Sequence, residues 1–380
     1  MNGSSAARSV AIIGAGIGGL ALARALTVRG LQAEVYEASA EIKGAGGGLI
    51  VPPNSARILD RLGLGEVFRA GVPLRQMQIL DAGGQVLYRR DQGEVRQAQG
   101  YGLHTVSRAA LHQALQAALP PQILFPGFRL QELRRMGDKH YAVFANGQQV
   151  VADLIVAADG AQSRARALMF PEVHLEPTGQ VAMRGVARAA LPPAFQRSFT
   201  EIWGSGRRIT FFPLANDEVY WHAAFSADHL GARPSLNEVA QHYAQFPQPV
   251  AHLLEATDPQ TLQTTLLQDL EPLPQWSRGN VALLGDAAHA TSPNLGQGAA
   301  QALEDAAALA ELLGQEVRLE TALFAYQKRR ERYANAAVAR SRQMGQIGQV
   351  GGPLRWIRNT TIKMNPELAR SRIEAFYEEH

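Results

Sequence analysis

Residues 9–37 read SVAIIGAGIGGLALARALTVRGLQAEVYE, and this stretch decides the fold that we expect for the chain. It opens with a short apolar run over 9–13, of the kind that forms a buried parallel strand. A glycine-rich turn follows, and apolar residues then recur at helical spacing over 20–29. A second apolar run over 33–36 leads to Glu37. The pattern therefore predicts a strand, a tight turn, a helix and a second parallel strand.

Three glycines of the turn each have a separate physical task. Gly14 makes the tight turn, Gly16 lets a pyrophosphate approach the backbone, and Gly19 allows the helix to pack closely on the strand. The N-terminus of the helix then faces the negative charge of the phosphates. Glu37 stands at the end of the second strand, where its carboxylate can accept hydrogen bonds from a ribose. The stretch predicts a binding site for an adenine dinucleotide.

Two later segments narrow the dinucleotide to FAD. Residues 153–166 read DLIVAADGAQSRAR, a strand that ends at Asp159 and turns into the start of a helix. Residues 280–304 read NVALLGDAAHATSPNLGQGAAQALE, a strand that ends beside Asp286 and a loop that opens an alanine-rich helix. An aspartate just beyond a strand can bind ribityl hydroxyls. The helix N-terminus can face the flavin pyrimidine edge, which becomes negative on reduction. His289 in this loop is interpreted as a histidine satisfied by its surroundings.

Composition and charge exclude several other classes of protein. The 380 residues contain no cysteine, which removes disulfides, thiol catalysis and most zinc sites, and we expect no metal. Apolar residues make up 46% of the chain, as in a globular protein with a sizeable core. The net charge is only +3 and the basic cluster at 328–332 is typical of a solvated helix face, so we expect no nucleic-acid partner. No apolar run reaches the ~18 residues of a membrane span, and we expect a cytoplasmic protein.

Four patterns together resemble the class A flavoprotein monooxygenases, the aromatic hydroxylases of the para-hydroxybenzoate and salicylate hydroxylase type. The patterns are GAGIGG with Glu37, SRAALHQAL with Arg108, ADGAQSRAR, and GDAAHATSPNLGQGAAQALED. The segment at 46–64, GGGLIVPPNSARILDRLGL, is similar to the family's segment after the ribose-binding strand. The resemblance implies bound FAD, NADPH or NADH as a transient reductant, and O2. It also implies a C4a-hydroperoxyflavin that hydroxylates a small aromatic or polycyclic substrate.

The resemblance also implies roles for particular residues. It implies that Glu37 binds the adenosine ribose, that Arg108 reaches the pyrophosphate and ribityl region, and that Asp159 takes part in cofactor and nicotinamide handling. It makes Asp286 the ribityl ligand and places Pro293 beside the reactive face of the flavin. The backbone contacts that it implies come from Gly14, Gly16, Gly19, Gly48, Gly296, Gly298 and Ala299. The simpler alternatives are a helix-capping role for Asp286 and a surface position for Arg108.

The predicted fold class is α/β: a Rossmann-like FAD-binding domain with a parallel sheet and helices, plus a substrate domain with an antiparallel β-sheet. The substrate domain is expected to contain a hairpin over 76–90 that turns at Gly83-Gly84, and further antiparallel strands over 181–226. The FAD-binding domain is predicted over 1–72, 98–177 and 270–345, the substrate domain over 73–97 and 178–269, and a C-terminal helical segment over 346–380.

Three residues of the antiparallel sheet are candidates for the substrate side of the site. Side chains of a strand alternate between its faces, so one in two can face the flavin. Arg184 lies where relatives place a polar residue over the flavin, and Phe212 and His222 lie on two arms of a hairpin. We name Arg184, His222 and Pro293 as catalytic candidates, and Phe212 and His222 as substrate contacts. The alternatives are an ion pair at the domain junction for Arg184 and core packing for Phe212.

Other classes of flavoprotein fit the sequence less well. A disulfide reductase needs a cysteine pair and a second dinucleotide domain, and the chain has neither. A reductase or halogenase of the same superfamily and a non-catalytic FAD-binding protein stay open as alternatives. Because no second glycine fingerprint exists for a nicotinamide cofactor, that reductant is expected to dock transiently. The sequence leaves open the substrate, the choice between NADPH and NADH, and whether the protein is a monomer or a homodimer.

Overall fold

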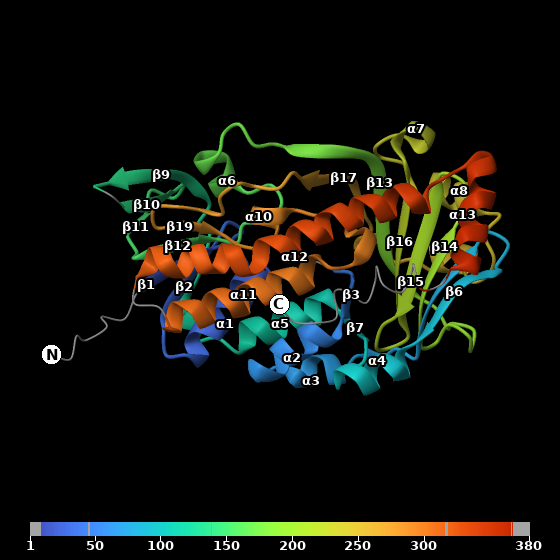
Figure 1. Ribbon diagram of the computed structural model, residues 1–380, viewed down its shortest axis with the longest axis horizontal. Helices are drawn as coiled ribbons and strands as arrows, with labels where there is room; N and C mark the ends of the chain where they lie inside the picture. Colours follow the sequence, from blue (N-terminus) through green and yellow to red (C-terminus); the bar gives the residue numbers. More distant parts are fainter. Residues whose placement is uncertain (1–8, 45, 138, 316–317, 366, 368–380) are drawn as a thin grey trace.

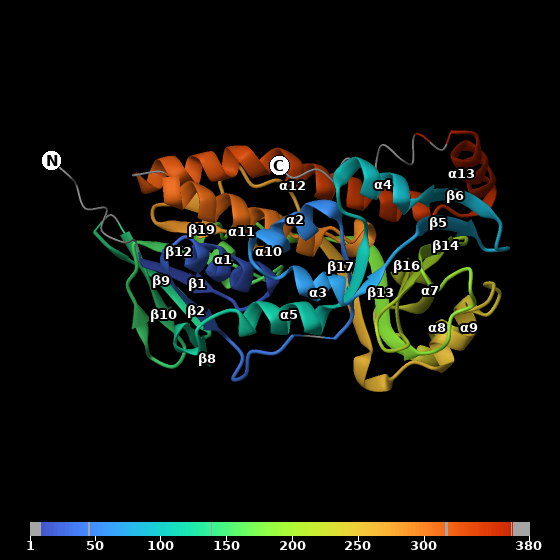
Figure 2. The same cartoon turned by 90° about the horizontal axis from the view of Figure 1, so that it is seen from below.

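Two large β-sheets lie toward opposite ends of an elongated molecule, joined by one long helix (Figure 1). The computed structural model describes residues 9–44, 46–137, 139–315, 318–365 and 367. Figure 2 shows the same arrangement from below, with the long helix along one side of both halves. The two sheets are built from alternating stretches of one chain.

The first sheet has six strands in the order β18-β19-β12-β1-β2-β8, and all but the edge strand β18 run parallel. Its central strand β1 is buried, as the apolar run predicts. The strand bounds are β1 Ser9–Ile13, β2 Gln32–Glu37, β8 Leu124–Pro126, β12 Leu154–Ala157, β18 Ser277–Arg278 and β19 Val281–Leu283. The predicted parallel sheet is confirmed, with β2 slightly longer than expected because Gln32 pairs with β1 and Glu37 pairs with β8.

Helix α1 (Ile17–Val28) follows β1 and begins three residues earlier than the helical spacing predicts. The difference arises at Gly16, whose carbonyl accepts the first helical hydrogen bond from the Leu20 N–H at 3.0 Å. The glycine turn therefore belongs partly to the helix. Helices α1, α11 (Gly298–Gln315) and α5 (Arg108–Ala117) pack together beside this sheet.

The second sheet has seven strands in the order β17-β13-β16-β15-β14-β5-β6, antiparallel except for the β14–β5 pair. The predicted hairpin at Gly83-Gly84 and the predicted strands over 181–226 are confirmed. The strand bounds are β5 Gln76–Asp81, β6 Val86–Asp91, β13 Leu175–Arg188, β14 Ser198–Trp203, β15 Arg207–Pro213, β16 Glu218–Ser226 and β17 Gln263–Leu270. Strands β13 and β17 run through the predicted domain limits at 177 and 270, so those limits stay a prediction.

Each face of the seven-stranded sheet has a different neighbour. One face packs its apolar side chains, among them Phe211, Trp221 and Phe225, against helices α8 (Leu236–Tyr243) and α9 (Val250–Glu255). The opposite face, which we call the inner face, lies toward β3 (Gly48–Val51), η3 (Pro293–Leu295) and the long helix α12 (Leu319–Gly348). The alternation of side chains along each strand therefore separates a core face from a face that borders the candidate site.

Short elements complete the fold around the two large sheets. One small sheet is β3-β7-β4 and another is β11-β10-β9. The remaining bounds are α2 Pro53–Arg61, α3 Gly65–Arg69, β4 Val72–Pro73, α4 Gln92–Gln99, β7 His104–Ser107, η1 Pro121–Ile123, β9 Leu130–Met136, β10 Lys139–Phe144, β11 Gln149–Val150, α6 Arg164–Met169, α7 Ala227–Leu230, η2 Pro259–Thr261, α10 Asp286–His289 and α13 Gly352–Met364. Within the described ranges, no helix combines the length and apolar character needed to cross a membrane.

A buried ionic network ties α11 to α12, and it corrects the solvated face expected at 328–332, because Arg330 of that cluster is buried. Arg330 of α12 contacts Glu304 and Asp305 of α11, with an Nε–Oδ1 distance of 2.8 Å to Asp305, and donates to Gln301 at 2.8 Å. Asn54 of α2 donates to the remaining oxygen of Glu304. Burial raises the pKa of Glu304 to about 7, and the negative charge of Asp305 adds to this effect while Arg330 and Asn54 oppose it.

The Glu304→Gln variant tests this network. The pKa of Glu304 lies above its ordinary value of 4.5, so the folded protein holds a proton that the unfolded chain has released. Stability from this group is present below pH 4.5 and is lost as the pH rises through about 7. We expect the wild type to lose about 3 kcal/mol more unfolding free energy than Glu304→Gln between about pH 5 and pH 8.

Urea unfolding at several pH values measures this difference. Glu311→Gln is the matched control, because Glu311 lies on the same helix but pairs with Arg329 at the surface, at 3.1 Å. Parallel pH dependence in the wild type and Glu304→Gln would show that Glu304 stays ionised in the folded protein.

Candidate active site

The glycine turn between β1 and α1 is shaped by close backbone contacts. Gly14 has a φ of +103°, and a Cβ there would lie 2.5 Å from the Ala158 carbonyl oxygen. A Cβ on Gly19 would lie 2.0 Å from the Gly14 oxygen, so helix and turn are in contact. Gly16 differs, because nothing lies within 4 Å of the place where its Cβ would be. The turn thus has no space for side chains at Gly14 and Gly19, whereas the backbone at Gly16 is accessible to a ligand.

The structure brings Glu37 to the same turn. Its carboxylate accepts hydrogen bonds from the backbone N–H of Ala15 at 2.8 Å and of Ser39 at 2.9 Å. Glu37 ends β2, which pairs with β1 in parallel, so both strands deliver their carboxyl ends to one edge. Strand pairing therefore places the acid and the glycine turn side by side, as the motif predicts.

Two further aspartates follow neighbouring parallel strands at this edge. Asp159 follows β12 and accepts from the Ala165 N–H at 3.1 Å, while its other oxygen is buried without a hydrogen-bond partner among the described residues. Asp286 follows β19 and is half-buried, and within the described chain no donor bonds its carboxylate. Burial raises the pKa of both aspartates, against the attraction of nearby arginines in the case of Asp286. Both groups therefore have unused capacity to accept hydrogen bonds.

The first turn of α11 lies next to Asp286. A Cβ on Gly298 would lie 3.7 Å from the Asp286 Oδ1, so the N-terminus of α11 is adjacent to this carboxylate. Gly296 is exposed just before this helix with a φ of +64°, and Ala299 is half-buried in its first turn. Pro293 begins the η3 turn and is half-buried. The loop thus presents backbone groups beside Asp286.

Asp305 holds the Asp286 turn from inside the protein. Its Oδ2 accepts from the Gly285 N–H at 3.0 Å and lies 2.6 Å from the His289 Nε2. His289 is buried, and its ring centroid lies 5.1 Å from that of Trp276. Burial opposes the charge of Asp305, but His289 and Arg330 outweigh it and lower its pKa to about 2. His289 is therefore a satisfied histidine, as interpreted from the sequence, with Asp305 as its partner.

Arg166 links the two aspartate segments. It is buried in α6, and its guanidinium donates to the carbonyls of Ala287 at 3.1 Å and Ala161 at 2.5 Å. A third bond reaches the Asp286 carbonyl at 3.3 Å. The sequence pattern includes Arg166 but does not assign it this bridging position, because Asp286 and Ala287 lie more than a hundred residues away in the chain.

Arg108 connects the cofactor side with the inner face of the seven-stranded sheet. It begins α5, and its N–H donates to the Gly47 carbonyl at 2.9 Å. Its side chain is exposed, yet surrounding protein atoms lower its pKa, with Asp286 acting in the opposite direction. Arg184 and Tyr220 are also close enough to act on the charge of Arg108. Arg108 therefore lies within electrostatic range of Asp286 and Arg184 while its side chain stays exposed, and its cofactor role stays a prediction.

The inner face carries the predicted substrate residues. Arg184 on β13 stands opposite His222 on β16, and Phe212 on β15 stands opposite Tyr220. Their neighbour Trp221 points to the core face. Arg184 Nε donates to the Gln263 Oε1 at 3.1 Å, a neutral partner in place of the ion pair that was considered for it. Alternation along the strands thus puts all of the predicted residues on one face.

His222 is buried, and its Nε2 has no hydrogen-bond partner among the described residues. Burial lowers the pKa of His222 to about 3, and the charges of Arg208 and Arg184 act in the same direction. The imidazole is therefore neutral at neutral pH and is a weak proton acceptor. It can still form one hydrogen bond with a neutral group.

Phe212 packs within a small apolar cluster. Its side chain is 3% exposed, and its ring centroid lies 5.0 Å from that of Tyr220 and 6.0 Å from that of Phe199. A Cβ on Gly48 would lie 2.6 Å from the Phe212 ring, so only a glycine in β3 fits beneath it. This burial favours the core-packing alternative for Phe212, and a direct substrate contact stays a prediction.

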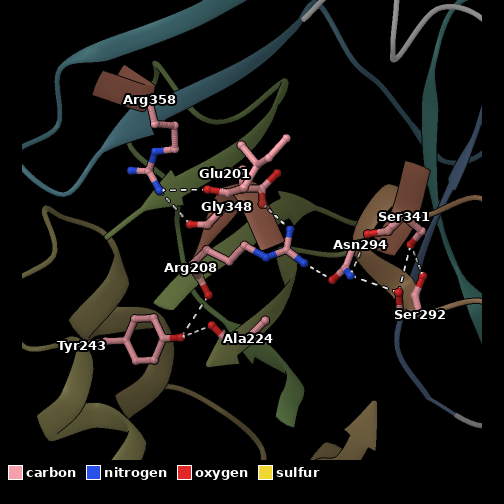
Figure 3. Close-up of polar contacts among 10 residues, drawn as sticks. Glu201, Arg208, Ala224, Tyr243, Ser292, Asn294, Ser341, Gly348 and Arg358 are labelled. Carbon is pink, nitrogen blue, oxygen red and sulfur yellow. Dashed lines mark hydrogen bonds and ion pairs between the residues drawn. The ribbon is translucent and has the colours of Figure 1, made fainter. Parts of the chain in front are cut away.

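A second group on the inner face was not identified from the sequence. Arg208 contacts Glu201 at 2.6 Å and donates to Asn294, which donates to the Ser292 Oγ and the Ser341 carbonyl at 3.0 Å each (Figure 3). These bonds join the seven-stranded sheet to the loop that contains Pro293. Arg208 and Phe212 lie on the same face of β15, and Tyr220 and His222 lie on the same face of β16. The alternation of side chains along these strands could therefore have identified Arg208 and Tyr220 from the sequence.

Comparisons with known proteins identify relatives along almost the whole chain. Residues 7–341 match the FAD binding domain family. The chain is 32% identical over 375 residues to the aurachin C monooxygenase/isomerase of Stigmatella aurantiaca, covering 97% of this chain and 96% of that protein. It is 34% identical over 380 residues to the 2-heptyl-3-hydroxy-4(1H)-quinolone synthase of Pseudomonas aeruginosa, covering 96% of each.

A solved structure shows the same architecture. HpxO of Klebsiella pneumoniae, complexed with FAD and uric acid, superposes with a TM-score of 0.88 at 27% identity and covers 98% of this chain and 97% of that one. The fold likeness thus extends over both large sheets. Within the described ranges, no group of three or more His, Asp or Glu side chains could hold a metal ion.

Substitutions at two glycines separate packing from ligand binding. In Gly19→Ala the new methyl meets the Gly14 carbonyl, so we expect a loss of about 1–3 kcal/mol in unfolding free energy. In Gly16→Ala the methyl meets no protein atom, so stability without ligand stays within ~0.5 kcal/mol of wild type. FAD affinity nevertheless falls by about tenfold or more, because the methyl occupies the space that the pyrophosphate approaches.

Urea unfolding of the FAD-free proteins and flavin fluorescence titration measure the two effects. Gly314→Ala is the control, because its methyl makes an ordinary contact 3.7 Å from the Arg29 Cδ and lies at the opposite end of α11 from the site. Wild-type FAD affinity in Gly16→Ala would show that the pyrophosphate does not pass this residue.

Proposed function

Because this chain belongs to the FAD-dependent monooxygenases of the FAD binding domain family, we propose that it hydroxylates a nitrogen-containing bicyclic aromatic substrate of the quinolone class, with NADPH or NADH and O2. The flavin, when bound, supplies the activated oxygen. The observation that carries the proposal is the position of β3 between two surfaces: Gly47 accepts from the Arg108 N–H, and Gly48 packs under Phe212 and Tyr220 of the inner face. One surface suits the cofactor and the other suits the substrate.

The residues at the sheet edge fit FAD. The turn at Gly16 leaves its backbone open to a pyrophosphate, and Glu37 at the end of β2 is placed for the adenosine ribose. We assign the ribityl chain to Asp286, because ribityl hydroxyls supply the donors that its carboxylate lacks within the described chain. The backbone N–H groups of Gly298 and Ala299, at the start of α11, are assigned to the pyrimidine edge of the flavin.

Further cofactor contacts are assigned by position. Gly14 and Gly19 shape the turn, while Gly48 and Gly296 offer backbone next to the inner face and the Pro293 loop. Arg108 is assigned to the pyrophosphate and ribityl region, and Asp159 to the handling of the cofactor. Within the described chain, one buried oxygen of Asp159 has no hydrogen-bond partner. It can therefore accept a hydrogen bond from the cofactor, which supports this role.

The inner face supports a flat, largely neutral substrate. The buried cluster of Val186, Phe212, Leu214 and Tyr220 makes this part of the inner face apolar and aromatic, which suits the aromatic rings of a substrate. Beside it, Arg184 can donate to a ring carbonyl, and the neutral His222 can form one hydrogen bond with a ring N–H or carbonyl. The relative from Pseudomonas aeruginosa makes, by its name, a 3-hydroxy-4(1H)-quinolone, and this supports the quinolone class.

The reductant and the setting of the reaction complete the proposal. The chain has one glycine fingerprint, which FAD uses, so NADPH or NADH docks transiently and leaves before oxygen reacts. Water must then be kept from the flavin, and burial of His222 and Phe212 on the inner face serves this purpose. Nicotinamide cofactors are abundant in the cytoplasm, where we place the enzyme as a monomer or a homodimer.

A substrate screen tests the function. The purified protein should be yellow with bound FAD, and 2-heptyl-4(1H)-quinolone should stimulate oxidation of NADPH or NADH and gain one oxygen atom by mass spectrometry. Uric acid and salicylate, which are anionic at neutral pH, serve as comparison substrates. FAD binding with reduction but no oxygenated product would favour a reductase of the same superfamily. A protein that cannot be reconstituted with FAD would overturn the whole proposal.

His222→Gln tests the substrate face without touching the flavin side. Loss of one hydrogen bond should raise KM about tenfold with FAD binding unchanged. Because its pKa of about 3 keeps His222 neutral above about pH 5, the pH profile of kcat/KM between pH 6 and 8 should not change. The control is His252→Gln, since His252 is exposed on α9. An apparent pKa near 6 or 7 that disappears in His222→Gln would instead make His222 the catalytic base.

A further inference from the structure

Helix α13 exposes a group of large apolar side chains. The exposed fractions are 62% for Leu354, 72% for Trp356, 52% for Ile357 and 81% for Met364. Other exposed large apolar side chains in the described chain are spread over separate elements, at Val28, Val86, Met136, Val151, Leu266 and Phe324. Single exposed apolar residues are ordinary on a protein surface, but a contiguous group on one helix marks an interaction site.

The inner side of α13 fixes which face points outward. Arg358 is buried and donates to the carbonyl of Gly348 at 3.0 Å (Figure 3). It also donates to the carbonyls of Ile347 at 3.2 Å and Val350 at 3.4 Å. Its guanidinium also lies 5.1 Å from the Trp203 ring centroid. Ile362 packs on the apolar cluster around Trp203. Rotating the helix to cover Trp356 would break these contacts, so its apolar residues are held outward.

The charge of α13 favours one kind of partner. Its sequence, GPLRWIRNTTIKM, has three basic residues and no acidic one. Arg355 and Lys363 are exposed, and among the described residues Lys363 donates to a neutral partner, the Gln85 Oε1 at 3.1 Å. A second copy of this helix would bring the same positive charges and would repel it. A surface that combines apolar depth with negative charge is complementary to it, and a bilayer with anionic lipids has both.

We propose that α13 docks this protein on the surface of a membrane that contains anionic lipids. Trp356, Leu354 and Ile357 enter the boundary between headgroups and acyl chains, and Arg355 and Lys363 remain at the headgroups. Figures 1 and 2 both show α13 at one end of the long axis, beside β6, where it can meet a flat surface. The insertion is shallow and involves no spanning helix. The inference rests on α13 alone and does not depend on the proposed substrate.

Co-sedimentation of the FAD-loaded protein with lipid vesicles tests the proposal. We expect binding to vesicles of equal parts phosphatidylcholine and phosphatidylglycerol, weaker binding at high salt, and little binding to phosphatidylcholine alone. The triple variant Leu354→Ser, Trp356→Ser, Ile357→Ser should lower the bound fraction about tenfold or more. Phe324→Ser is the matched control, because Phe324 is 65% exposed on α12. Unchanged FAD absorbance and melting temperature establish that each variant is folded.

Tryptophan fluorescence gives an independent readout. Of the four tryptophans, Trp203, Trp221 and Trp276 are almost fully buried, so a blue shift of emission on vesicle binding reports Trp356. The shift should disappear in Trp356→Phe, while vesicle binding largely remains. Equal sedimentation of the wild type and the triple variant would overturn the proposal. So would dimerisation of the wild type, seen by analytical ultracentrifugation, that the triple variant abolishes, because the face would then serve a second copy.

Discussion

The buried carboxylate of Asp305 is the point on which the rest of the structure depends. It accepts from the Gly285 N–H at 3.0 Å, contacts His289 at 2.6 Å and pairs with Arg330 at 2.8 Å. Three separate elements thus meet on one side chain: the turn after β19, the helix α11 and the long helix α12. Because a lone buried charge is costly, removing any partner would disturb all three. The position of Asp286, one residue beyond Gly285, follows from this arrangement.

Helix α12 carries the same constraint to the other half of the molecule. Near its end, a Cβ on Gly345 would lie 2.8 Å from the Gln180 amide oxygen, and one on Gly348 would lie 2.9 Å from Arg208. The seven-stranded sheet therefore rests directly on the helix that Arg330 anchors. Asn294 adds a polar link from Arg208 to the Pro293 loop (Figure 3). The two surfaces of the candidate site are consequently held at a set separation by one rigid element.

The site keeps polar groups whose partners the described chain does not supply. Asp159 has a free buried oxygen, Asp286 lacks a donor, and His222 has an unbonded Nε2. Each such group costs stability when it is buried without a hydrogen bond. A ligand that brings donors offsets this cost, so binding of the cofactor and substrate should stabilise the protein by mass action. The polar atoms without hydrogen-bond partners in the described chain thus include several that lie where FAD and the substrate are proposed to bind.

The sequence by itself determined the parts that depend on local spacing. It determined β1, the glycine turn, the placing of Glu37 and Asp286 after strands, and the alternation that gives Arg184 and His222 one face, because the apolar period and the glycine positions are local properties. Only the tertiary structure decided that Arg166 bridges two distant segments, that Arg208 joins the sheet to Asn294, and that α13 turns Trp356 outward. These depend on contacts between residues far apart in the chain, and local spacing carries no record of which distant partner a side chain will meet.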